Sequence, residues 1–133
     1  MTDTPFADRI TVTNRRYAPV HSGNHVRIHV GRPSPLGNPY RIGLDGNRAT
    51  VINRYRTWLA RAAVNDPAVR AELTRIIHFV FEGMPVDLEC WCAPAACHAD
   101  VIRELVLLRL EELTEPVDDG AAPVLVGGGE ARQ

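Results

Sequence analysis

Two short stretches of this chain, 25–30 and 86–92, alternate apolar and polar residues, and the interval between them has helical periodicity. Alternation with a period of two is typical of β-strands, whereas apolar residues at i, i+3 and i+4 are typical of amphipathic helices. Two strands joined by a helical crossover pair in parallel within one sheet. We therefore expect residues 25–30 and 86–92 to be parallel neighbours, with the segments that follow them at the same edge of the sheet.

The remaining elements follow from the same two periods. Residues 10–14 alternate and predict another short strand. Three sets of apolar residues at helical spacing are expected to face the core, and His78 is predicted to pack with them. The sets are Val51, Ile52, Tyr55, Trp58, Leu59 and Ala62 in the first helix, Val69, Leu73, Ile76, Ile77 and Val80 in the second, and Val101, Ile102, Leu105 and Leu108 in the third. The predicted fold class is α/β, a small single domain with a short, mainly parallel sheet of about three strands flanked by three helices.

The chain has 133 residues, which is the size of one domain. Residues 1–8 show no periodicity and are predicted to be a flexible leader, residues 9–113 to form the domain, and residues 114–133, rich in Gly and Pro, to be a disordered tail. Since no charged start precedes an apolar run and no apolar stretch approaches ~20 residues, we expect a cytoplasmic protein without a membrane partner.

The segment 90–98 contains every cysteine of the chain, Cys90, Cys92 and Cys97, followed by His98. In a reducing compartment, such a cluster indicates metal binding or reactivity rather than disulfides. One interpretation is a zinc site with all four residues as ligands, although the spacing is unusual for zinc. Another is a reactive thiolate at Cys97, beside His98 at the start of a helix. A third is packing, which is favoured for Cys90 because free cysteines are often buried.

The segment 31–39 reads GRPSPLGNP, and its prolines and glycines predict a shaped loop. One interpretation is a ligand-binding loop, in which glycines let the backbone approach a ligand closely, an arginine guanidinium group binds an anion, and Ser and Asn side chains form hydrogen bonds that orient the ligand. A rigid turn with a capping serine is the alternative. An arginine at the start of the following helix favours an anion site. The predicted ligand-binding residues are Gly31, Arg32, Ser34, Gly37, Asn38 and Arg48.

The charge is unevenly distributed although the net charge is only −1. Between Arg9 and Arg61 there are ten arginines and one acid, Asp45, which gives this half a formal charge of +9. A local excess of this size predicts an anionic partner for the amino-terminal half. Trp91 either stacks on a base or sugar, or covers the far side of the sheet.

These two motifs together resemble a family of small bacterial and phage proteins classified only as a domain of unknown function. The resemblance rests on Gly31 to Pro39, on Tyr55 in an arginine-led helix, and on the CWCxPxxCH pattern of residues 90–98, and it covers roughly residues 10–110. It implies that both motifs belong to one shared site, but it implies no reaction.

The leading functional hypothesis is an enzyme that acts on a phosphate-bearing small molecule, such as a nucleotide or a nucleic-acid component. Cys92, Cys97 and His98 are its candidate catalytic residues, and its reaction type is open. Two alternatives remain. One is a nucleic-acid-binding module held together by zinc or by packing alone, and the other is a thiol redox sensor based on Cys97. The sequence predicts no oligomeric state.

Overall fold

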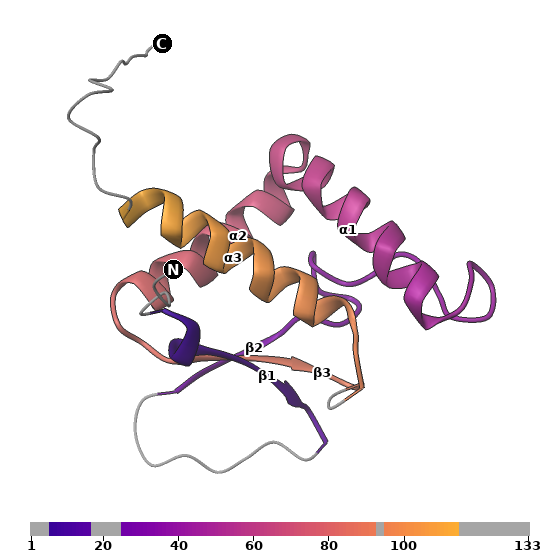
Figure 1. Cartoon of the computed structure of the whole chain (residues 1–133), viewed down its shortest axis with the longest axis horizontal. Helices are drawn as coiled ribbons and strands as arrows, with labels where there is room; N and C mark the ends of the chain where they lie inside the picture. Colours follow the sequence, from indigo (N-terminus) through magenta and orange to yellow (C-terminus); the bar gives the residue numbers. More distant parts are fainter. Residues whose placement is uncertain (1–5, 17–24, 93–94, 115–133) are drawn as a thin grey trace.

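A computed structural model describes residues 6–16, 25–92 and 95–114. In chain order, the elements are η1 (Ala7–Arg9), β1 (Ile10–Asn14), β2 (Val26–His29), α1 (Arg48–Asn65), α2 (Pro67–Phe81), β3 (Val86–Cys90) and α3 (His98–Thr114). Three helices and a three-stranded parallel sheet confirm the predicted small α/β domain (Figure 1). None of the helices in these ranges combines the length and apolar character needed to cross a membrane.

The sheet has the order β1-β3-β2, and both outer strands run parallel to β3. Leu88 at the middle of β3 pairs in register with Val12 on one side and Ile28 on the other. The predicted parallel pairing of β2 with β3 is therefore confirmed. Figure 1 shows that β1 and β3 end on the same side of the molecule as the first turns of α1 and α3. The sheet thus gathers four chain segments at its carboxyl edge.

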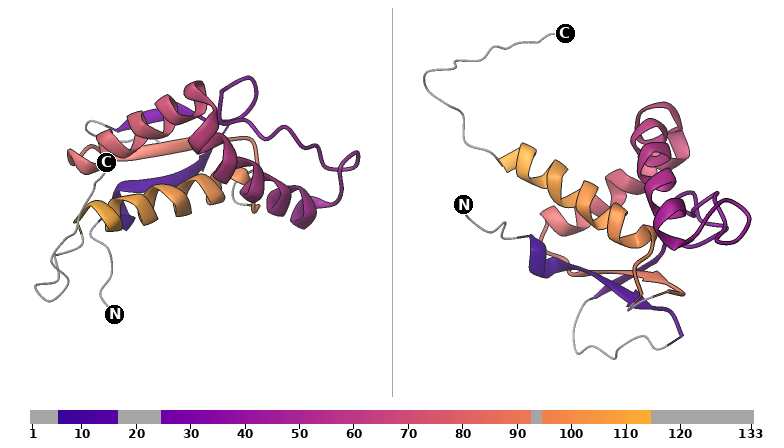
Figure 2. Two further views of the ribbon diagram at one scale, coloured as in Figure 1. Left: turned by 90° about the horizontal axis from the view of Figure 1, so that it is seen from above. Right: turned by 45° about the vertical axis from the view of Figure 1, so that its right-hand side comes forward.

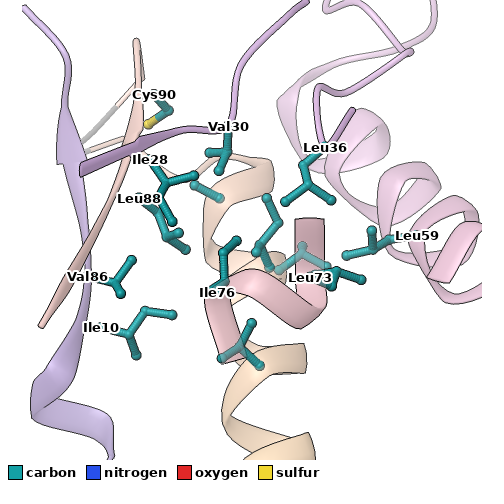
Figure 3. Packing of buried hydrophobic residues seen from close by; sticks show 14 of the residues in the cluster. Ile10, Ile28, Val30, Leu36, Leu59, Leu73, Ile76, Val86, Leu88 and Cys90 are labelled. Atoms are coloured by element: carbon teal, nitrogen blue, oxygen red, sulfur yellow. The ribbon is translucent and has the colours of Figure 1, made fainter. Parts of the chain in front are cut away.

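The helices lie on one face of the sheet, and the two further views in Figure 2 show the same arrangement. Apolar side chains of the strands meet those of α1, α2 and α3 in one buried cluster. Figure 3 shows this cluster with Ile28, Val86 and Leu88 on the sheet side and Leu59 and Ile76 on the helix side. Burial of this apolar surface is the main stabilising contribution to the fold.

Helix ends agree with the local chemistry of the sequence. The Asn47 side chain accepts a hydrogen bond from the Thr50 N–H (2.9 Å) at the start of α1. Asp66 caps α2, with Pro67 as its first residue. Gly83 has a φ of +95° just beyond α2, a conformation that glycine adopts without strain.

The opposite face of the sheet is polar. Asp87 and Glu89 are only 1% and 8% exposed, although alternation along β3 places them on the face opposite the core residue Leu88. The Thr11 hydroxyl donates to Asp87 (2.9 Å), and Arg15 lies 3.5 Å from the Glu89 carboxylate. These charge and hydrogen-bond partners compensate for the burial of both acids.

The structure places residues at both predicted boundaries and corrects two side-chain placements. Phe6 is buried and residues 7–9 form η1, so part of the predicted leader 1–8 packs with the domain. At the other end α3 extends to Thr114, while residues 1–5 and 115–133 lie outside the described part. His78 and Leu108 are exposed, so their predicted core positions are wrong.

Candidate functional site

The two motifs line one pocket of about 510 Å³ at the carboxyl edge of the sheet. Its volume is within the ordinary range of small-molecule sites. The residues that line it come from the segment after β2, the first turns of α1 and the segment between β3 and α3: Gly31, Arg32, Asn38, Tyr40, Arg41, Ile42, Leu44, Arg48, Val51, Ile52, Trp91, Cys92, Ala96, Cys97 and His98. The strand topology that the crossover imposes is the physical reason that these distant segments meet.

The segment after β2 folds into successive tight turns. The Ser34 N–H donates to the Gly31 carbonyl (2.8 Å), and the Gly37 N–H donates to the Ser34 carbonyl (2.9 Å). Gly31 is buried, and a Cβ atom there would lie 2.9 Å from the His29 ring. Glycine thus lets the chain pass close to the His29 ring where it leaves β2, and a larger residue would require that ring to move.

Ser34 and Gly37, which were predicted to contact a ligand, do not line the pocket. The Ser34 hydroxyl accepts a hydrogen bond from the Leu36 N–H (3.0 Å), as in a local turn. A Cβ atom at Gly37 would lie 3.0 Å from backbone atoms of Arg32. Both residues therefore shape the loop, and neither is among the residues that line the pocket.

Asn38 lines the pocket, but it is only 8% exposed and its side chain is engaged with protein. Its Oδ1 accepts from the Tyr40 N–H (2.9 Å), and its Nδ2 donates to the Val51 carbonyl (3.4 Å). Its own carbonyl accepts a hydrogen bond from Arg32 Nη1 (2.5 Å). We therefore describe Asn38 as a residue that positions Arg32, in place of the predicted direct contact with ligand.

Tyr55 of α1 connects the two motifs, a role that neither its place among the predicted core residues nor its part in the family resemblance indicates. Its hydroxyl donates to the Leu36 carbonyl (2.7 Å), and its ring packs edge-on against the His98 ring, with centroids 5.1 Å apart. Burial raises the pKa of Tyr55 well above its usual range, so the phenol stays protonated as a donor. One buried side chain thus fixes the loop 31–39 relative to the start of α3.

Among the described residues, three arginines line the pocket, and none of the lining residues is Asp or Glu. Arg32 follows Gly31, and Arg48 is the first residue of α1, where its Nη1 donates to the Ala96 carbonyl (2.9 Å). Arg41 was not predicted as a site residue. Its backbone N–H donates to the Asp45 side chain (2.8 Å), and its guanidinium makes no hydrogen bond or ion pair within the described residues. The pocket therefore carries concentrated positive charge.

Cys97 is buried directly before α3, where its Sγ accepts a hydrogen bond from the Ala99 N–H (3.3 Å). Its thiol donates to Cys90 Sγ across 3.2 Å. This hydrogen bond and burial raise the pKa of Cys97, opposing the effect of the helix start. A reactive thiolate at Cys97, and the redox sensor built on it, are therefore not supported. Cys92 is half-buried and lines the pocket beyond the end of β3.

His98 is the first residue of α3 and lines the pocket, with most of its surface buried. Its Nε2 lies 2.7 Å from the Val30 carbonyl oxygen, so Nε2–H is the donor in the neutral ring and Nδ1 keeps its lone pair. Burial lowers the pKa of His98, with a smaller contribution from the nearby positive charge of Arg32. The ring is therefore neutral near pH 7 and able to accept a proton.

The predicted zinc site with Cys90, Cys92, Cys97 and His98 is not assembled. Within 6–16, 25–92 and 95–114, no group of three or more His, Cys, Asp or Glu side chains is arranged to hold a metal ion. The hydrogen bond to Val30 and the contact with Tyr55 hold the His98 ring, and the Cys97 thiol is engaged with Cys90. These residues do not fit a four-ligand zinc site.

Fold and site together define a small α/β domain with an arginine-lined pocket where its parallel strands end. A family model described as a domain of unknown function (DUF4326) matches residues 13–107. The chain belongs to this family, and the resemblance seen in its sequence motifs is confirmed. No curated protein and no solved structure matches the chain.

Proposed function

We propose that this protein is an enzyme that acts on a phosphate-bearing small molecule bound between its two motifs. The observation that carries the proposal is the set of three arginines, Arg32, Arg41 and Arg48, in a pocket whose lining, in the part of the chain that the structure describes, includes no acid. Guanidinium groups bind phosphate oxygens through paired, charge-assisted hydrogen bonds. The start of α1 adds the partial positive charge of a helix amino terminus near Arg48.

Cys92 and His98 supply the groups available for chemistry in the same pocket. Neutral His98 is the candidate general base, because its Nε2–H is held by Val30 and its Nδ1 is free of a proton. Cys92 is the candidate thiol because Cys97 is buried and held protonated. Of the three predicted catalytic residues, we keep Cys92 and His98 and assign Cys97 to packing and helix capping.

The test is binding of inorganic pyrophosphate, measured by isothermal titration calorimetry. Replacing Arg41 with Ala removes a guanidinium that holds no described part of the protein, so we expect a stable variant with roughly tenfold weaker binding. Arg48→Gln should give a similar loss. Arg61→Ala is the matched control, because Arg61 is exposed on α1 but does not line the pocket. Pyrophosphate binding that is absent, or equal in all four proteins, would overturn the proposal.

A nucleic-acid-binding module is the second candidate, and one observation favours it. Arg15 and Arg16 are exposed just beyond β1, at the same sheet edge as the pocket, and add two arginines to the cationic side chains there. For this function, a single-stranded 12-mer should bind far more tightly than pyrophosphate, with an affinity that falls steeply between 50 and 200 mM salt. Weak binding of the 12-mer, with no such salt dependence, would exclude this candidate and leave the enzyme.

A further inference from the structure

The pocket has an apolar side as well as a cationic one. Seven large hydrophobic side chains are exposed in the described part of the chain, and three of them, Ile42, Leu44 and Trp91, line this pocket. Their exposed fractions are 53%, 81% and 59%. Apolar groups gathered at a concave site, rather than scattered, indicate a surface that a ligand covers.

Trp91 directly follows β3, and its indole ring is held by two contacts. The guanidinium carbon of Arg15 lies over the ring, 6.0 Å from the centroid, and the His29 ring meets it edge-on with centroids 6.4 Å apart. These contacts restrict the ring while leaving more than half of its surface exposed. A flat, electron-rich surface held in place in this way is suited to stacking against another aromatic ring.

The two sides together specify the ligand more closely than charge alone. The arginines require an anionic group, and Trp91, Ile42 and Leu44 require a flat apolar group in the same molecule. A sugar phosphate meets the second requirement less well than a nucleotide does, because its ring is not flat and its hydroxyl groups must leave water to contact apolar side chains. We propose that the ligand is a nucleotide whose base stacks on Trp91, an inference that rests on the proposed function of the arginine pocket.

The test compares ribose 5-phosphate with the four ribonucleoside 5′-monophosphates. The chain has two tryptophans, so Trp58→Phe leaves Trp91 as the sole indole reporter. We expect at least one nucleotide to quench its fluorescence saturably and to bind roughly 5- to 150-fold more tightly than ribose 5-phosphate. By calorimetry on the full chain, Trp91→Ala should abolish this advantage, so that the nucleotide and ribose 5-phosphate bind the variant with similar affinity. Trp91→Phe should keep most of the affinity advantage of the nucleotide, because an aromatic ring remains. Leu113→Ala, at an exposed site on α3, is the matched control.

Failure of this inference and failure of the proposed function give different results. If ribose 5-phosphate binds as tightly as every nucleotide, and Trp91→Ala changes neither affinity, the assignment of the ligand as a nucleotide is overturned. The proposal that the pocket binds phosphate is then retained. If neither class of ligand binds, the phosphate pocket itself is wrong. If a nucleotide binds with an advantage that survives Trp91→Ala, its base lies elsewhere and the assignment to Trp91 is overturned.

Discussion

Tyr55→Phe tests whether one buried hydroxyl holds the pocket together. The side chain is fully buried, and its hydroxyl donates a 2.7 Å hydrogen bond to the carbonyl of Leu36, which is itself fully buried. The substitution keeps the ring and removes the donor, so the carbonyl loses its partner without access to water. A buried polar group left unsatisfied costs about 1–3 kcal/mol, and we expect the free energy of unfolding to fall by this amount.

Urea unfolding followed by circular dichroism measures this change, with the slope against urea unchanged because the same surface is exposed on unfolding. Tyr40→Phe is the control, since the Tyr40 hydroxyl makes no hydrogen bond within the described residues and its loss should stay within about 0.5 kcal/mol. Pyrophosphate affinity should fall along with stability in Tyr55→Phe. An unfolding free energy equal to that of the wild type would refute the reasoning.

Three further predictions concern the Cys and His side chains. Burial lowers the pKa of His98, so the unfolded chain binds a proton at a higher pH than the folded chain does, and the free energy of unfolding should decrease as the pH falls below about 6.5. In urea unfolding, His98→Gln should weaken this dependence on acid pH. His78→Gln, at an exposed position, is the control and should preserve it. Iodoacetamide should label Cys92 in the native protein and reach Cys90 and Cys97 only as the chain unfolds, and equal labelling of Cys97 and Cys92 would contradict its burial. Native mass spectrometry of protein purified without chelator should find no stoichiometric zinc, and one zinc per chain that is lost in Cys97→Ser would restore the metal interpretation.

Periodicity and connectivity were sufficient to predict the fold class and the meeting of the two motifs. A helical crossover between the strands in 25–30 and 86–92 favours parallel pairing of these strands. Parallel pairing then places the segments that follow both strands at the carboxyl edge of the sheet. The side of β3 on which β1 pairs was not predictable, because no local pattern distinguishes the two edges of a strand. The exposed Leu108 shows a related ambiguity: α3 carries apolar residues on several sides, so spacing alone does not fix which side is buried.

The site was harder to predict than the fold because loop residues have no period. Arg41, Ile42 and Leu44 line the pocket, but nothing in the sequence says which way their segment turns. Arg41 was counted within the positive half, and that charge excess was the one available signal. Ser34 and Gly37 lie outside the pocket lining, and composition alone does not show this because a turn and a ligand cradle use the same residue types.

The central position of β3 has a consequence for how the protein is made. Within the described residues, β1 and β2 each pair only with β3, and the hydrogen bond between Thr11 and Asp87 joins residues 76 positions apart. During synthesis, neither early strand has a partner in the sheet until residues 86–90 have left the ribosome. Such non-local pairing slows folding, because the entropy of closing a long loop is lost before the contacts between strands stabilise the sheet. The arginine-rich segments therefore emerge well before the sheet that holds them, and the pocket forms only after β3 has been synthesised.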